Sequence, residues 1–178
     1  GAIFLPSVIS LVVGTMIFVW LLNPLSGPVA LLFKALGRAL PIWSNTQGLV
    51  IVVLSIITSW KIFGYNFIVV MAGVSSVPLE VVEAARLDNI PTWRIFLNIV
   101  VPMSSSTGIY VLILSIVTGM QQLFTPINMV TQGGPDNAST NLIYAVYDQA
   151  FGFFKTGTAS AYAILMMLLF GFLLFLEF

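Results

Sequence analysis

The chain has 178 residues, of which 59% are hydrophobic and only 7% are charged, and its mean hydropathy is +1.08. About 25% of a typical soluble domain is charged, so these charges are too few to cover a water-facing surface. The six basic and six acidic residues cancel, which gives no argument for a nucleic-acid partner, and the lack of Cys and His excludes disulfide scaffolds, most zinc sites and the usual Cys–His or Ser–His catalytic pairs.

The sparse charges divide the chain into four long apolar segments, at about 3–22, 48–72, 101–124 and 157–177. A membrane-spanning helix needs about 20 mostly apolar residues, and within lipid it must satisfy its own backbone hydrogen bonds. We therefore predict an all-α fold, a polytopic transmembrane helical bundle with four spans. Because the chain begins with Gly inside an apolar stretch and ends without a polar tail, we expect it to be a fragment of a longer chain.

The first connecting segment, 23–47, opens with the turn-rich sequence Asn-Pro-Leu-Ser-Gly-Pro. It continues with an apolar stripe that lies opposite Lys34 and Arg38 and consists of Leu31, Leu32, Ala35, Leu36 and Ala39. This pattern is typical of a short helix in the membrane interface, and it fits equally a loop helix packed on its own protein.

The second connecting segment, 76–98, holds five of the twelve charges and therefore cannot lie in lipid. Pro78 and Glu80 favour the start of a helix there. The sequence at 89–91, Asn-Ile-Pro, ends that helix, since Asn tolerates the left-handed conformation and Pro cannot continue a helix. A second short helix is expected over 92–98.

The third connecting segment, 125–156, combines a turn-rich stretch at 132–137 with a helical pattern at 142–151. Tyr144 and Tyr147 lie three residues apart on that pattern. Tyrosine is enriched where a protein crosses the membrane–water boundary, so we expect this pair to anchor the helix there.

A motif spans the second connecting segment and the start of the third apolar segment, and it consists of Glu83-Ala84-Ala85, Asp88 and Ile99-Val100-Val101-Pro102. It resembles the EAA loop of binding-protein-dependent ABC importer permeases. The family has Gly where this chain has Asn89, and because Asn accepts a positive φ, we expect the turn to persist. The resemblance implies a six-span permease core, of which about two spans precede Gly1.

A second motif lies near the C-terminus and consists of Thr131-Gln132-Gly133-Gly134-Pro135, Thr140, Tyr144, Tyr147, Ala150-Phe151, Gly157 and Ala161. It resembles the signature of sugar permeases similar to the maltose-transporter subunit MalF. The implied function is that of a membrane-spanning permease subunit that forms the translocation pathway for a sugar or oligosaccharide in the bacterial or archaeal plasma (inner) membrane. The implied partners are a cytoplasmic ABC ATPase dimer, a second, non-identical permease subunit and an extracytoplasmic solute-binding protein.

The resemblance also implies that residues 76–98 form a cytoplasmic loop that couples the permease to the ATPase. The residues that we expect to make this contact are Glu83, Ala84, Ala85, Arg86, Asp88 and Asn89. Glu83 would pair with a basic residue of the ATPase. The chain has no Gly-rich phosphate loop, so we expect it to be no enzyme and to hold no cofactor, with ATP bound by the partner. The alternative is a solvated amphipathic loop without a partner.

A candidate substrate cavity is predicted from polar residues inside the spans. Lys61 lies near the middle of the second predicted span, where a charge is costly and usually functional. In the family the second and third of these spans line the substrate cavity. The residues expected there are Thr58, Trp60, Lys61, Tyr65, Asn66, Gly119, Met120 and Gln122. Aromatic, hydroxyl, amide and ammonium groups suit a neutral polyol. Alternatively, Lys61 pairs with another span and the other polar groups only hold helices together.

Three other functions each account for some of these features. A permease for glycerol phosphate or a polyamine shares the same motifs, although a phosphate favours more basic residues than Lys61 alone. A non-transporting scaffold does not account for the EAA loop, and an intramembrane enzyme lacks acid–base candidates in its spans. The positive-inside rule leaves the orientation undecided, with two basic residues in 76–98 against three in the other two loops. ATP-driven coupling places 76–98 inside, and 23–47 and 125–156 outside.

Overall fold

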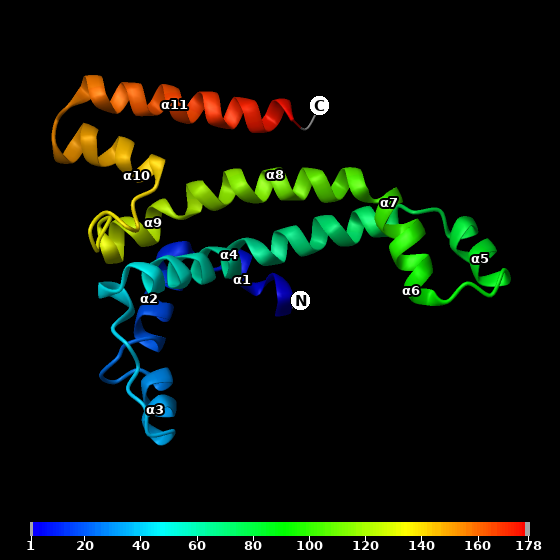
Figure 1. Cartoon of the computed structure of the whole chain (residues 1–178), viewed down its shortest axis with the longest axis horizontal. Helices are drawn as coiled ribbons and strands as arrows, with labels where there is room; N and C mark the ends of the chain where they lie inside the picture. Colours follow the sequence, from blue (N-terminus) through cyan, green and yellow to red (C-terminus); the bar gives the residue numbers. More distant parts are fainter. Residues whose placement is uncertain (1, 177–178) are drawn as a thin grey trace.

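The computed structural model describes residues 2–176, and over this range the chain is all-α, with helices throughout and no strand (Figure 1). Three helical stretches are long and apolar enough to cross a membrane: Gln47–Ser75, Ser105–Thr131 and Thr156–Phe175. They correspond to the second, third and fourth predicted spans. The last residue of the fourth predicted span, 177, lies outside the described residues.

The long helices α4 (Gln47–Ser75), α8 (Ser105–Gln122) and α11 (Thr156–Phe175) run lengthwise beside one another in Figure 1. α8 packs along α4, whereas α11 packs mainly on the short helix α10 (Leu142–Tyr147) that precedes it. Beyond Gln122 the third stretch continues through α9 (Phe124–Pro126) and the π-helical turn η4 (Ile127–Thr131). Pro126 has no N–H to give to the helix, which explains the irregular backbone here.

The prediction of one continuous helix over the first span, 3–22, was wrong. The structure divides it into η1 (Ala2–Phe4), α1 (Leu5–Val8) and α2 (Leu11–Leu21). At Ile9 and Ser10 the backbone is extended, with ψ of 137° and 138°. Tertiary contacts of α1 with α4, which are described below, cause this break, and hydrophobic periodicity carries no sign of them.

The third predicted span, 101–124, begins later than predicted. A separate helical stretch consists of α6 (Thr92–Ile95), the π-helical turn η3 (Phe96–Val100) and α7 (Val101–Met103), and it ends at Ser104. Pro102 cannot donate to the preceding turn, so a wider turn before it is expected. The Ser104 hydroxyl donates to the carbonyl of Val100 at 2.7 Å, and α8 begins one residue later.

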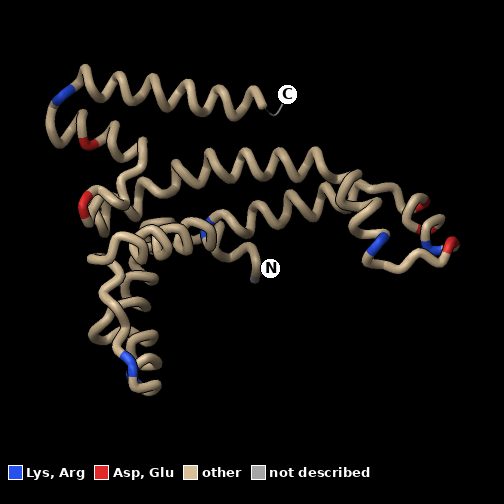
Figure 2. Tube along the Cα trace, in the orientation of Figure 1, with Lys and Arg blue, Asp and Glu red and all other residues tan. Residues whose placement is uncertain are grey.

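Apart from Lys61, which lies in the middle of α4, the charged residues gather at the two ends of the bundle (Figure 2). One end carries α5 (Leu79–Leu87) and α6, which are the short helices predicted for the second connecting segment. The other end carries α3 (Pro28–Ala35), η2 (Trp43–Asn45), α10 and the π-helical turn η5 (Asp148–Gly152). In Figure 1 α3 extends across the direction of α4.

The buried core lies at the end of the bundle that carries α10. It joins α2, the first half of α4, η4 and α10, and consists of Leu11, Trp43, Val50, Val53, Leu54, Ile57, Ile127 and Tyr144. The Trp43 indole N–H donates to the carbonyl of Leu22 at 3.0 Å, which satisfies the polar atom of a buried ring. This core fixes one end of α4 and leaves its middle for the site described next.

Candidate functional site

A cavity of about 280 Å³ lies between α1, α4 and α8, and its lining consists of Phe4, Ser7, Lys61, Ile62, Tyr65, Asn66, Thr118 and Gln122. Four of the eight predicted cavity residues are among them: Lys61, Tyr65, Asn66 and Gln122. Lys61 is the middle residue of α4 (Gln47–Ser75), so the cavity lies halfway along the longest helix.

Lys61 is half-buried and holds the break between α1 and α2. Its ammonium group donates to the carbonyls of Pro6 at 3.4 Å, Ser7 at 2.9 Å and Ile9 at 2.5 Å. The Ser7 hydroxyl donates in return to the Lys61 carbonyl at 3.3 Å. Because α1, α4 and α8 contain no Asp or Glu, the partners of this cation in the cavity are neutral carbonyl dipoles, and its positive charge is not neutralised there.

A second polar contact joins α4 to α8. The Asn66 amide donates to the Ser115 hydroxyl at 2.7 Å, and that hydroxyl donates to the carbonyl of Val111. Asn66 therefore also holds two helices together, which was the alternative reading of the polar residues. In contrast, the Gln122 amide and the Tyr65 hydroxyl have no hydrogen-bond partner among residues 2–176, and both are available to a bound molecule.

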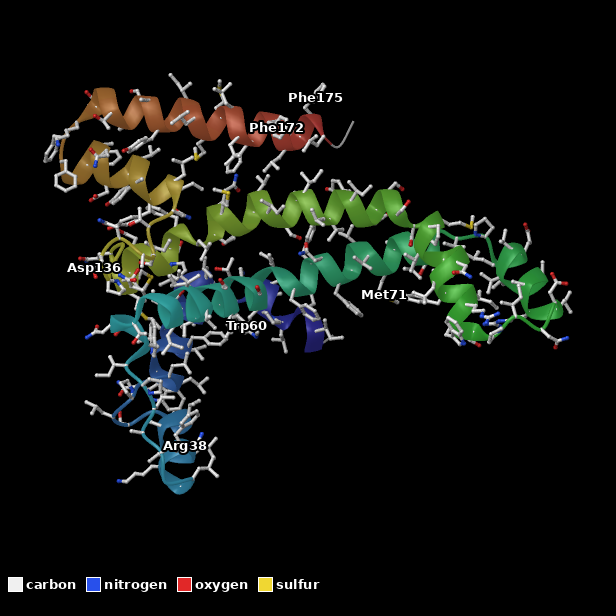
Figure 3. The ribbon with its side chains drawn as sticks, viewed as in Figure 1. Arg38, Trp60, Met71, Asp136, Phe172 and Phe175 are labelled. Atoms are coloured by element: carbon white, nitrogen blue, oxygen red, sulfur yellow. The ribbon has the colours of Figure 1, made fainter. Side chains whose placement is uncertain are left out.

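The other four predicted cavity residues lie elsewhere. Trp60 projects from α4 toward α2, where its ring lies 5.4 Å from that of Phe18 (Figure 3). Thr58 is buried against the core with 4% of its surface exposed. Gly119 and Met120 are absent from the lining, and the Met120 carbonyl accepts from the Asn141 amide at 2.9 Å.

Four lining residues were missed by the sequence analysis: Phe4, Ser7, Ile62 and Thr118. Thr118 precedes Gln122 by four residues and follows Ser115 by three, so helical periodicity could have found it. Phe4 and Ser7 belong to the broken first segment, and no periodic pattern connects that segment with α4.

The loop between α4 and α8 forms the second candidate site. α5 ends in a Schellman motif, in which the Ile90 N–H donates to the Ala85 carbonyl at 3.1 Å and the Asn89 N–H to the Arg86 carbonyl at 3.0 Å. Asn89 has a φ of 54°, as predicted from its place in the EAA motif. The cap fixes the end of α5, with Glu83, Ala84, Arg86 and Asp88 exposed and Ala85 buried.

The same loop exposes large apolar side chains that the sequence analysis did not single out. The exposed fractions are 65% for Leu79, 83% for Leu87 and 60% for Trp93, whose ring lies 5.1 Å from the Arg94 guanidinium. This loop holds five of the twelve charges and cannot lie in lipid. The loop therefore combines charged residues with large exposed apolar side chains.

A protein-family model matches residues 2–176, nearly the whole chain, and its description is "binding-protein-dependent transport system inner membrane component". The chain belongs to this family. Its curated relatives include the sn-glycerol-3-phosphate transport system permease proteins UgpA of Yersinia enterocolitica, 30% identical over 167 residues, and of Brucella abortus, 31% identical over 163 residues. These matches cover 93% and 91% of this chain, and 56% and 55% of the relatives.

A solved structure shows the same fold for this family member. It is a crystal structure of a bacterial alginate ABC transporter in complex with an alginate pentasaccharide-bound periplasmic protein, with a TM-score of 0.86 and 19% sequence identity. The match covers 98% of this chain and 61% of the matched chain. The chain described here spans about half the length of the curated relatives that it matches.

Gly64 allows the broken first segment of this chain to lie directly on α4. A Cβ atom at Gly64 would lie 2.7 Å from the carbonyl oxygen of Ile3, 2.8 Å from the Ser7 hydroxyl and 3.1 Å from the Cα of Phe4. We expect Gly64→Ala to destabilise the protein by about 1–3 kcal/mol, because the backbone of η1 and the Ser7 side chain of α1 must move away. Thermal unfolding in detergent measures this as a lower midpoint.

Gly119→Ala is the matched control for that substitution. Gly119 lies in α8, and nothing lies within 4 Å of the Cβ that the change would add. Ala favours a helix over Gly by up to about 1 kcal/mol, so this variant should be as stable as the unmodified protein or slightly more stable. Equal midpoints for the two variants would show that α1 does not rest on Gly64.

Proposed function

We propose that this chain is part of the permease subunit of an ABC importer in the bacterial inner membrane, and that its cavity lies on the path of an organic solute. One observation carries the proposal: an ammonium, a phenol and an amide converge in a cavity halfway along α4, and α4 leads directly to the EAA loop. Family membership supports the same role. ATP hydrolysis then belongs to a partner subunit.

The proposed partner of α5 is the cytoplasmic ABC ATPase. The exposed carboxylate of Glu83 and the exposed side chain of Leu87 supply one charged and one apolar contact on a short helix with a rigid cap. Only residues 76–78 separate α5 from α4, so a movement of α5 passes directly to the helix that carries Lys61. A second permease subunit and a solute-binding protein complete the proposed importer.

The proposed solute is a sugar or oligosaccharide, or as a second candidate a glycerol phosphate. The Tyr65 ring and the Gln122 amide provide the stacking surface and the hydrogen-bonding group that a polyol needs. The second candidate is favoured by Lys61, whose positive charge is held by carbonyl dipoles without a carboxylate in α1, α4 or α8. The relatives named as glycerol-3-phosphate permeases support it as well.

Uptake into proteoliposomes tests this proposal with the full-length permease and its cognate partner subunits. Labelled maltose and labelled sn-glycerol 3-phosphate serve as the two probes, and ATP-dependent uptake of one of them is expected. Gln122→Ala should raise the KM for that solute about tenfold, the effect of losing about 1.4 kcal/mol of hydrogen bonding. Gln121→Ala is the control, since Gln121 is the exposed neighbour that lies outside the cavity lining.

Two results would contradict the proposal. ATP-dependent uptake of neither probe would reject both solute classes. Equal KM values for the Gln122→Ala and Gln121→Ala variants would place the transport path away from this cavity, because only Gln122 lines it.

A further inference from the structure

The break at Ile9 and Ser10 exposes backbone carbonyls in the middle of the bundle. α1 has only four residues, and the extended conformation of its two following residues leaves the carbonyls of its last turn without helical donors. Lipid supplies no hydrogen-bond donor, so carbonyls at a helix break within a membrane must accept from the protein or from water in a cavity. This break therefore needs a donor from outside its own helix.

Lys61 is that donor. An ammonium group has three N–H bonds and accepts none, and the carbonyls of Pro6, Ser7 and Ile9 match that number. The arrangement serves both sides, since the negative ends of carbonyl dipoles stabilise a cation that is otherwise costly within a membrane. Lys61 comes from the continuous helix α4, so the position of the break is set by α4.

The same ammonium group also lines the cavity, together with Ser7 and Phe4 of the broken segment. All three of its N–H bonds are used by carbonyls, so an oxygen of a bound solute can accept from Lys61 only by replacing one of them. Hydroxyl and phosphate oxygens are both able to do this. A bound solute and the carbonyls at the break therefore compete for the same three N–H bonds of Lys61.

We propose that Lys61 is a positioning residue that couples occupancy of the cavity to the α1–α2 break: a solute that accepts a hydrogen bond from Lys61 frees a carbonyl of α1 and loosens the break. This inference rests on the proposed function, since it assigns the solute to this cavity. A fixed structural cap would hold the break to the same extent with and without solute, which is the difference that an experiment can measure.

Hydrogen–deuterium exchange measures the break directly in the full-length permease, assembled with its partner subunits in lipid nanodiscs. The peptide to follow covers residues 2–14, and a peptide from α11, which does not line the cavity, serves as the internal reference. The probes are maltose and sn-glycerol 3-phosphate. The probe that the uptake assay shows to be transported should accelerate exchange in 2–14 and leave the reference unchanged.

Substitutions of Lys61 distinguish its pairing with the carbonyls at the break from the displacement of those carbonyls by a solute. Lys61→Met removes every donor, so exchange in 2–14 should be about tenfold faster without solute, and the transported probe should add nothing further. Lys61→Gln keeps two N–H bonds, so its rate of exchange in 2–14 should lie between those of the unmodified protein and Lys61→Met. This variant replaces Lys61→Met in the experiment if the Met variant fails to assemble. Ile68→Met is the matched control, because Ile68 is exposed on the same helix outside the cavity lining, and its exchange should equal that of the unmodified protein.

Each possible result decides a part of the inference. Unchanged exchange of 2–14 in the presence of a transported probe would make Lys61 a fixed cap and overturn the coupling. Normal exchange in both Lys61 variants would overturn the cap itself. If uptake of neither probe occurs, the proposed function has failed, and the solute-free comparison of the variants still decides whether Lys61 holds the break.

Discussion

Glu83→Lys should leave the permease inserted in the membrane and abolish its coupling to the ATPase. Glu83 is exposed on α5, whose end is fixed by the Schellman motif at Asn89, so its carboxylate is presented in a defined position. Reversing one charge of a contacting pair places two positive charges together and costs at least about 2 kcal/mol, on the order of thirtyfold in affinity. Copurification of the ATPase subunit and solute-stimulated ATP hydrolysis measure the loss.

Asp136→Lys is the matched control for this charge reversal. Asp136 is exposed at the opposite end of the bundle, where it accepts a hydrogen bond from the Gln47 amide at 3.2 Å. The variant makes the same change in net charge, and copurification of the ATPase should be unaffected. If Glu83→Lys retains both the ATPase and solute-stimulated hydrolysis, α5 is not the docking element.

Single cysteines should reveal opposite sides of the membrane at positions 88 and 137. Asp88 ends α5 and Asn137 lies in the loop before α10, so the two positions are at opposite ends of the bundle (Figure 1). Both are exposed, and the chain has no native Cys to interfere. If α5 faces the cytoplasm, a membrane-impermeant thiol reagent added to intact cells should label Asn137→Cys and spare Asp88→Cys.

Permeabilised cells supply the control for the labelling experiment, since both positions should then react. The reverse pattern in intact cells would overturn the proposed orientation and, with it, the contact between α5 and a cytoplasmic ATPase. The positive-inside rule does not decide the orientation, because 76–98 holds two basic residues and the loops on the other side hold three. The labelling experiment therefore decides it.

The sequence allowed the long helices to be predicted because their determinants are local. Apolar runs, interrupted in α4 only by Lys61, gave α4 and α11 to within a few residues, and the place of Asn89 in a known motif predicted its positive φ. Two boundaries differ where a distant residue or a proline decides the backbone. The break before α2 depends on Lys61 and Gly64, more than 50 residues away, and the late start of α8 follows the kink at Pro102.

The candidate cavity was half predicted for the same reason. Tyr65 and Gln122 were found because they are polar residues in apolar helices, which is a local signal. Trp60 has the same signal, but its ring packs on α2, and the face that a ring occupies depends on its neighbours. Ser7 gave no signal at all, because its role arises only when α1 lies on Gly64.

The length of α4 has a mechanical consequence. Its 29 residues extend about 44 Å at about 1.5 Å per residue, against about 30 Å for the hydrocarbon core of a bilayer. A stiff rod with its fulcrum at Lys61 has an arm of roughly 21 Å toward α5, so a tilt of about 10° would displace the far end by roughly 4 Å. At Tyr65, four residues from the fulcrum, the same tilt would shift the backbone by only about 1 Å. In a lever of this kind, a large displacement of the loop would correspond to a small displacement of the cavity wall.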